Sequence, residues 1–229
     1  MSKPPPIELE FSGKYDREHA NMYLNKHKTG LSRRMSHWRE VQIARAALKM
    51  AGDPNLVLDL PSGAGRFWPM LCEQPNRMIL AADNSQDMLD AGMSGQAPEV
   101  TARVKPFQTS AFAIDLGENA VDCIFSMRLM HHIGKADHRQ AMLKEFKRVT
   151  RDTLVLSLWV DGNYKAWKRK RSEARRPAAE RDPLLQNRFV IPRETIEAEF
   201  KQAGFKIVGH KDFIPGYALW RIYVLRKLD

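Results

Sequence analysis

Short apolar runs alternate with helical patterns along most of this 229-residue chain, and that alternation restricts the fold more than any other feature. Runs of this length, bounded by turn residues, are typical of strands buried on both faces of a parallel sheet. The predicted strands are residues 55–60, 78–82, 104–107, 121–126 and 153–159, and the predicted helices are 31–50, 66–73, 85–91, 135–150 and 192–203. This order predicts a doubly wound, mostly parallel α/β sheet.

The C-terminal part departs from the alternation, because two further predicted strands follow one another without a helix between them. They cover residues 205–210 and 218–226, and Pro215 and Gly216 lie in the connection. Two consecutive strands joined by a short turn pair in opposite directions. We therefore predict an antiparallel hairpin at this end of the sheet.

Length and composition favour a single folding unit with a substantial core, since 43% of the residues are hydrophobic and 28% are charged. We expect residues 1–50 to form a tail and an N-terminal helical cap, and residues 51–229 to form the α/β domain. The start has three prolines and no apolar segment of the secretory type, and no apolar run reaches membrane-spanning length. A cytoplasmic location is therefore expected. Cys72 and Cys123 lie among apolar neighbours and are expected to be buried free thiols, and no metal site is predicted.

Positive charge is concentrated in one segment. Residues 163–188 hold nine Lys and Arg against three Asp and Glu, and so account for +6 of the net charge of +10. Such a local excess indicates an anionic partner, although a solvated surface helix fits the composition equally well. One predicted helical face presents Tyr164, Lys168, Arg171 and Arg175, with Trp167 beside it. A phosphorylated glycolipid, a nucleotide and RNA are the partners that this basic insert would suit.

A glycine-containing turn follows the first predicted strand and is the main candidate for a ligand site. The segment 59–67 reads DLPSGAGRF, and Gly63 and Gly65 allow the backbone to approach a ligand closely. Asp83 follows the second strand, 24 residues after Asp59, where a carboxylate accepts hydrogen bonds from ribose hydroxyls. Together the turn and the carboxylate predict a nucleoside-containing cofactor.

These segments resemble the class I S-adenosylmethionine-dependent methyltransferases of the small-molecule type. The resemblance runs from about residue 55 to residue 228, through LDLPSGAGRF, ILAADNSQDML, VDCIFSMRLMHHI, KEFKRVTRDTLVLSLW, AGFKI and WRIYVLRK. It implies a Rossmann-like, seven-stranded sheet whose last strand is antiparallel, with S-adenosylmethionine as cofactor. Several motifs in the right order make this resemblance more specific than any one of them.

The resemblance also implies roles for individual residues. Asp59 would orient the methionine end of the donor, Gly63 and Gly65 would bring the backbone against it, and Asp83 would hold the ribose. The full set of implied cofactor-binding residues is Asp59, Ser62, Gly63, Gly65, Asp83, Asn84, Met88, Ser110, Ala111, Phe112 and Ser126. Two positions depart from the family pattern, because Pro61 replaces a glycine and Ser110 replaces a frequent acidic residue.

Two sequence signatures that this chain lacks restrict the classes of methyl acceptor. The Asn/Asp-Pro-Pro-aromatic signature of exocyclic-amine methylation is absent after the fourth strand, and no cysteine follows a proline as a cytosine nucleophile would, so adenine N6 and cytosine C5 are disfavoured targets. A small or anionic acceptor, phosphorylated or lipid-linked, fits better. His131 and His132 are the candidate proton acceptors if the acceptor is a hydroxyl. The expected substrate residues are Arg128, Tyr23, Trp38, Lys168, Arg171 and Arg175, with the N-terminal helices, including Tyr15 and His37, covering the site.

Two other functions share part of this pattern. A nicotinamide-dependent oxidoreductase also has a glycine turn and a ribose carboxylate, but the C-terminal hairpin and the second of the resembling segments, ILAADNSQDML, argue against it. A methyltransferase-like regulatory binding protein, with an anionic nucleotide or partner on the basic helix, stays open because of Pro61 and Ser110. The sequence leaves the oligomeric state open.

Overall fold

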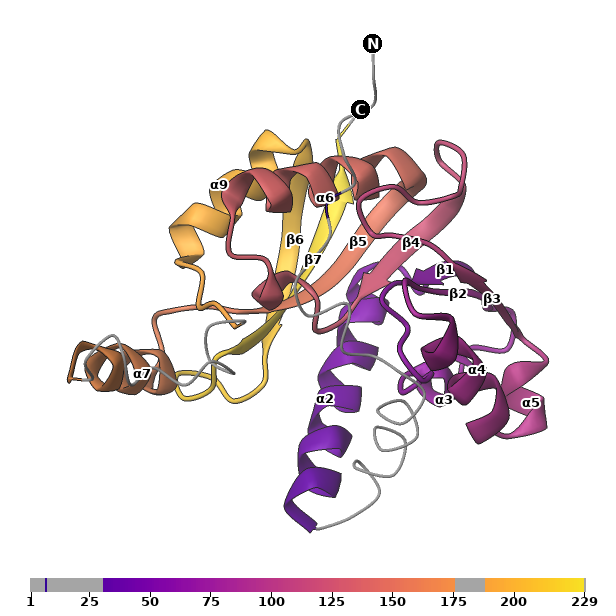
Figure 1. Cartoon of the computed structure of the whole chain (residues 1–229), viewed down its shortest axis with the longest axis horizontal. Coiled ribbons are helices and arrows are strands. Elements are labelled where there is room, and N and C mark those ends of the chain that lie inside the picture. The colour runs from indigo at the N-terminus through magenta and orange to yellow at the C-terminus, as the bar shows by residue number, and fades with distance from the viewer. Residues whose placement is uncertain (1–6, 8–30, 176–187, 229) are drawn as a thin grey trace.

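The computed structural model describes residues 7, 31–175 and 188–228, which build one seven-stranded sheet with helices on both faces (Figure 1). The strands are β1 (Leu56–Asp59), β2 (Met78–Asp83), β3 (Val104–Gln108), β4 (Val121–Ser126), β5 (Thr150–Trp159), β6 (Phe205–Asp212) and β7 (Trp220–Lys227). Their spatial order is β3-β2-β1-β4-β5-β7-β6. This confirms the predicted Rossmann-like α/β sheet.

The direction of the strands changes only at the C-terminal hairpin. Strands β1 to β5 pair in parallel, with Asp59 opposite Ala81 of β2 and Phe125 of β4. Strand β7 lies antiparallel between β5 and β6, and its Trp220 pairs with Trp159. The predicted hairpin and the antiparallel last strand are therefore confirmed. The order reverses beside β1, which is where open α/β sheets bind ligands at the carboxyl ends of their strands.

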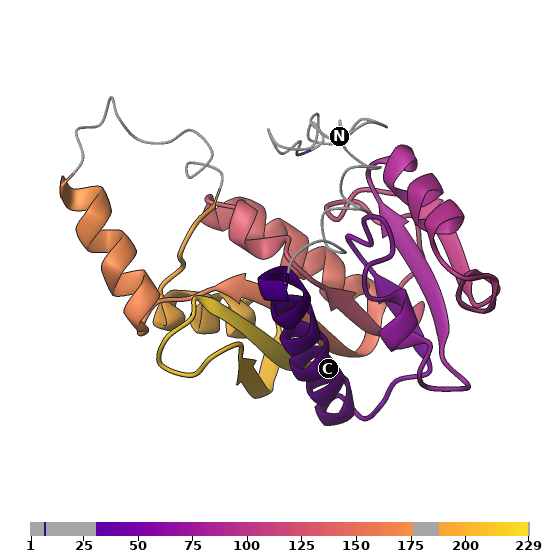
Figure 2. The same ribbon diagram turned by 90° about the horizontal axis from the view of Figure 1, so that it is seen from below.

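Helices cover both faces of the sheet (Figure 2). Their bounds are α2 (Leu31–Met50), α3 (Trp68–Leu71), α4 (Gln86–Gly95), α5 (Pro98–Thr101), the short 3₁₀-helix η2 (Met130–His132), α6 (Ala136–Val149), α7 (Tyr164–Arg175) and α9 (Arg193–Gln202). On one face α6 and α9 bury Phe146 and Phe200 against Leu58 and Ile124 of the strands. On the other face α2 and α3 pack against alternate strand residues, including Val57. Residues that alternate along a strand therefore supply two separate cores.

Most predicted elements agree with the structure to within a few residues, and three differ. The helix expected at 66–73 is reduced to α3, because Gly65 takes a left-handed φ of +72° and the helix begins only at Trp68. Strand β5 begins at Thr150, directly after α6, so the loop expected before residue 153 is missing. Helix α5 follows Ala97 and is started by Pro98, which the apolar pattern did not indicate.

Helix α7 projects from one end of the molecule, opposite to α4 and α5 in both views (Figures 1 and 2). Only Ala166 of this helix is buried. Of the expected thiols, Cys123 is buried and Cys72 is half-buried, and both are free. Among the described residues, no helix combines the length and the apolar character needed to cross a membrane.

Candidate active site

The chain leaves β1 through a turn that remains attached to the neighbouring strands. Leu60 donates its backbone N–H to Phe125 at 3.0 Å, and Ser62 donates to Ala82 at 2.8 Å. Gly63 and Gly65 then adopt positive φ angles of +55° and +72°. A Cβ added to Gly65 would lie 2.5 Å from the Trp68 ring, so both conformation and space require glycine there. The turn thus presents backbone at the carboxyl edge of the sheet.

Asp59, the last residue of β1, is buried beneath this turn with only 1% of its surface exposed. None of the described residues donates a hydrogen bond to either carboxylate oxygen. Burial, together with the charge of Asp83, raises the pKa of this carboxyl well above its usual range, and the nearby Trp68 and Ser62 only partly oppose the shift. The Trp68 Nε1–H donates instead to Ser62 Oγ at 3.0 Å. An unpaired buried carboxyl of this kind is costly and suits a cationic ligand.

Asp83, the last residue of β2, links the glycine turn to the start of α4. Its Oδ2 accepts the Gly63 N–H at 2.8 Å, and its Oδ1 accepts the Ser85 N–H at 3.0 Å. Burial raises the pKa of Asp83, and these backbone donors work in the opposite direction. Each carboxylate oxygen retains a further lone pair, so Asp83 can still accept hydrogen bonds from a ligand.

The other predicted cofactor residues surround the same edge. Met88 is buried on α4, and its Cε lies 3.4 Å from where a Cβ on Gly63 would be. Asn84 is exposed after β2, and its carbonyl accepts a hydrogen bond from Gln108 at 2.7 Å. The half-buried Ser110, Ala111 and Phe112 follow β3, where Ser110 Oγ accepts the Phe112 N–H at 3.2 Å. Loops after three adjacent strands thus converge here.

After β4 the chain passes through the buried Ser126 to Arg128, whose φ is +65°. Arg128 donates its backbone N–H to Ser157 Oγ at 2.8 Å and binds Glu40 through two guanidinium contacts of 2.7 and 2.8 Å. Arg66, in the glycine turn, donates to the same carboxylate at 2.6 Å and to His37 Nδ1 at 3.0 Å. A single carboxylate from α2 therefore joins the loops that follow β1 and β4.

The pKa of Glu40 is held below its usual value, although burial, the largest influence, acts to raise it. The hydrogen bond and charge of Arg128, followed by the charge of Arg66, outweigh that effect. The pKa of His37 is also lowered, first by burial and then by Arg66. His37 is therefore neutral at pH 7 and accepts a hydrogen bond from Arg66. The guanidinium groups of Arg66 and Arg128 have Glu40 as their shared carboxylate.

The two predicted catalytic histidines lie in η2, just after Arg128. His131 is 3% exposed, stacks on Trp159 at a centroid distance of 5.1 Å and meets the Trp220 ring edge at 4.7 Å. Burial, followed by the charges of His132 and Arg128, lowers its pKa well below the usual value. Its Nδ1 has no hydrogen-bond partner among the described residues, as is also true of Trp159 Nε1. His132 is half-buried, with its ring 4.0 Å from that of His131.

The remaining predicted substrate residues are exposed or lie outside the described residues. Trp38 lies on α2 with 62% of its surface exposed. Lys168, Arg171 and Arg175 are exposed on the projecting helix α7. Tyr15 and Tyr23 lie outside the described residues.

The sequence did not lead us to predict the ion pairs of Glu40 with Arg66 and Arg128, or the contact between Trp159 and Trp220. Glu40 falls on the same helical face as Ile43, Ala44 and Ala47, which are buried. A carboxylate on an apolar face indicates a buried ion pair, so this signal was present in the sequence. The contact between Trp159 and Trp220 had no such signal, because it depends on β7 lying beside β5.

The geometry can be compared with known proteins. Residues 57–153 match the family model of the methyltransferase domain. Among curated proteins, no sequence matches this chain. Among solved structures, the magnesium protoporphyrin IX methyltransferase of Synechocystis with bound SAH is similar with a TM-score of 0.68 and 18% identity, over 87% of this chain and 88% of that one.

Two further structures share the fold. The [4+2]-cyclase SpnF has a TM-score of 0.63 and 14% identity, over 82% of this chain and 80% of that one. A SAM-dependent methyltransferase of Methanosarcina mazei has a TM-score of 0.60 and 14% identity, over 76% of this chain and 93% of that one. At these identities the structures establish the fold, which is the Rossmann-like methyltransferase fold, and residues 57–153 match the methyltransferase domain.

Proposed function

We propose that this protein transfers a methyl group from S-adenosylmethionine to a small anionic acceptor, phosphorylated or lipid-linked. The observation that carries the proposal is the buried Asp59 carboxyl, which has no hydrogen-bond partner among the described residues and lies under a glycine turn. S-adenosylmethionine bears a sulfonium and an ammonium group, so its positive charge suits this position. The SAH bound in the Synechocystis relative supports the same donor.

The residues around the turn fit that donor. Asp59 would face the methionine end, Gly63 and Gly65 would present backbone to it, and Asp83 would accept the ribose hydroxyls on its remaining lone pairs. Asn84, Met88, Ser110, Ala111, Phe112, Ser62 and Ser126 would complete the site, as the family resemblance implies. When bound, the donor supplies a methyl group on an already activated leaving group. The protein then contributes mainly by positioning the acceptor.

The acceptor side carries positive charge and aromatic rings. Arg66 and Arg128 share the Glu40 carboxylate, and Arg169 and Arg188 lie against the Trp159 ring at 5.4 and 5.9 Å. Guanidinium groups beside the Trp159 ring favour a phosphate or carboxylate on the acceptor. His131 stays neutral at pH 7, so a ring nitrogen can accept a hydrogen bond from an acceptor hydroxyl, while its lowered pKa makes it a weak base for complete proton removal.

We also propose that residues 51–229 form the methyltransferase domain and that the preceding residues cover the site. Trp38 on α2 and Tyr23, which lies outside the described residues, would then belong to the covering segment.

The test is to incubate the protein with a cell extract and S-adenosylmethionine labelled in its methyl group, and to identify labelled products by mass spectrometry. An anionic labelled metabolite, absent with the Asp83→Ala variant, supports the proposal. Titration calorimetry with S-adenosylmethionine and NAD runs beside it. Binding of NAD alone overturns the proposal, and a folded protein that binds neither compound favours the regulatory binding protein instead.

A further inference from the structure

Three aromatic rings form an exposed row at the base of α7. Tyr217, in the loop between β6 and β7, stacks on Tyr164 with centroids 5.7 Å apart and planes at 10°. Tyr164 in turn lies 5.9 Å from Trp167. The exposed fractions of Tyr164, Trp167 and Tyr217 are 48, 55 and 44%. We call Tyr217, Tyr164 and Trp167 the aromatic row.

Cations lie on both ends of the aromatic row. Lys165 Nζ is 5.1 Å from the centre of the Tyr217 ring, and Arg171 Cζ is 5.3 Å from that of Trp167. Helix α7 carries six Lys and Arg and one Glu, and that Glu173 is paired with Arg169 at 2.7 Å. The surface therefore combines exposed rings with a strong local excess of positive charge.

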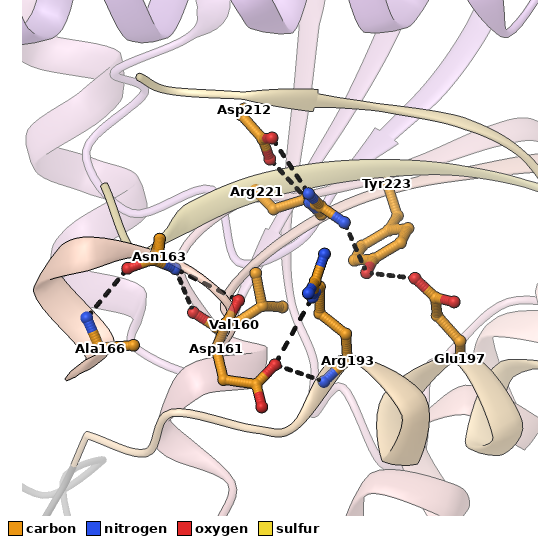
Figure 3. A network of polar contacts seen from close by, with 9 residues as sticks. All are labelled: Val160, Asp161, Asn163, Ala166, Arg193, Glu197, Asp212, Arg221 and Tyr223. Carbon is orange, nitrogen blue, oxygen red and sulfur yellow. Dashed lines mark hydrogen bonds and ion pairs between the residues drawn. The ribbon is translucent and has the colours of Figure 1, made fainter. Parts of the chain in front are cut away.

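The root of α7 is held in place by polar contacts (Figure 3). Asn163 caps the helix, because its Oδ1 accepts the Ala166 N–H at 2.9 Å while its Nδ2 donates to the Val160 carbonyl at 2.7 Å. Asp161 accepts the backbone N–H of Arg193 at 3.0 Å, which joins the root to α9. The rings are thus presented in a fixed arrangement, which lowers the entropy lost when a ligand binds.

The loop that carries Tyr217 is bonded to the same helix end. Tyr164 donates its backbone N–H to Gly216 at 2.9 Å, and Lys165 donates to Tyr217 at 3.0 Å. These contacts orient two segments of the chain, one before and one after α9, so that their rings stack. The stacking is therefore a product of the fold and not of one helix alone.

We propose that the aromatic row and the basic face of α7 bind a single-stranded nucleic acid, with bases stacked on the rings and phosphates held by Lys168, Arg171 and Arg175. Exposed rings beside a basic face are the features by which proteins bind single strands without reading sequence. The aromatic row lies on α7 and on the loop between β6 and β7, and not on the loops that follow β1 to β4, so the proposal does not depend on which molecule accepts the methyl group.

An anionic membrane surface is the competing ligand, since Trp, Tyr and Lys also gather at membrane interfaces. A helix that lies in the interface needs an apolar face, and α7 has no Leu, Ile, Val, Phe or Met. Its two alanines do not provide such a face, because Ala166 is buried against the protein. Charge and stacking together therefore favour a nucleic acid.

Fluorescence anisotropy of a labelled oligouridylate of about a dozen nucleotides tests the proposal. Trp167→Ala should weaken binding about tenfold, within the range for loss of one base stack, and leave the salt dependence unchanged. The triple variant K168A/R171A/R175A should weaken binding and reduce the slope of log affinity against log salt by about 2, as expected for three phosphate contacts to a single strand. Circular dichroism checks that each variant folds.

The matched control is the triple variant K144A/K201A/K206A, which removes the same charge from exposed positions elsewhere. It should bind the oligonucleotide as the unmodified protein does. An equal loss in this control, or unchanged binding by Trp167→Ala, overturns the proposal. So does binding to vesicles of phosphatidylcholine and phosphatidylserine without binding to the oligonucleotide.

Discussion

The Asp59 carboxylate is expected to lower the stability of the ligand-free protein and to strengthen binding of the donor. Its pKa in the folded protein is raised by burial, so the folded state holds the proton more tightly than the unfolded chain does. Stability is therefore greatest at low pH and falls as the pH rises from the ordinary carboxyl value through the raised one. The ligand-free protein should then be less stable at pH 7 than a variant that lacks this charge.

We predict that Asp59→Asn raises the free energy of unfolding of the ligand-free protein at pH 7 by about 0.5–2 kcal/mol, the usual gain of a stabilising substitution. The same change should weaken S-adenosylmethionine binding about tenfold or more, because the donor loses a charged partner. Urea denaturation and titration calorimetry measure the two effects. Asp90→Asn, at an exposed position of α4, serves as the control and should change neither quantity. Equal donor affinity in Asp59→Asn would remove Asp59 from the donor site.

Asp83 is the second residue whose role a substitution can isolate. Asp83→Ala should reduce the binding free energy of S-adenosylmethionine by about 1.5–3 kcal/mol, the range for hydrogen bonds to a charged group. Part of the loss will come from the glycine turn, since the Gly63 and Ser85 N–H groups lose their acceptor. Calorimetry on the folded variant measures this loss. An unchanged affinity for S-adenosylmethionine contradicts the assignment of Asp83 to the donor site.

At the scale of elements, Glu40 connects α2 to the loops after β1 and β4. Removing this carboxylate leaves two guanidinium groups, of Arg66 and Arg128, without their shared charge partner. We predict that Glu40→Gln lowers the free energy of unfolding by about 3–5 kcal/mol, as for one partner of a buried ion pair. Chemical denaturation at pH 7 measures this. Glu73→Gln breaks an exposed pair with Arg45 and should cost under about 1 kcal/mol.

The same network predicts a pH dependence. Because the pKa of Glu40 is lower in the folded protein than in the unfolded chain, its contribution to stability is complete above the unfolded value. That contribution is lost as the pH falls through the lowered value. Denaturation midpoints measured across this acidic range should decline less in Glu40→Gln than in the unmodified protein. Parallel declines in the two proteins would show that Glu40 is not the titrating group.

At the scale of the whole molecule, a donor that binds only the folded state must stabilise all of it. S-adenosylmethionine at about a hundred times its dissociation constant should add about 2.7 kcal/mol to the free energy of unfolding. Thermal denaturation with the donor, and separately with NAD at the same concentration, tests this. A rise in melting temperature with NAD and none with the donor is the result that would contradict the proposed function.

Much of the sheet could be predicted because its strands are buried on both faces. Three of the four residues of Leu56–Asp59 and four of the six residues of Val121–Ser126 are apolar, and a run of that kind needs neighbours on each side. The resemblance to methyltransferases likewise depends on local order, with Asp59 and Asp83 at the ends of successive strands. The length of α3 could not be predicted in this way, because the conformation of Gly65 outweighed the helical spacing around it.

What the sequence by itself determined is the set of elements and the chemistry at the ends of the first strands, since both depend on near neighbours in the chain. The tertiary structure alone decided which distant residues meet. Glu40 and Arg128 are 88 positions apart, and Tyr164 and Tyr217 are joined only because β7 returns beside β5. Contacts of this kind follow from the packing of both sheet faces together, and no local sequence pattern predicts them.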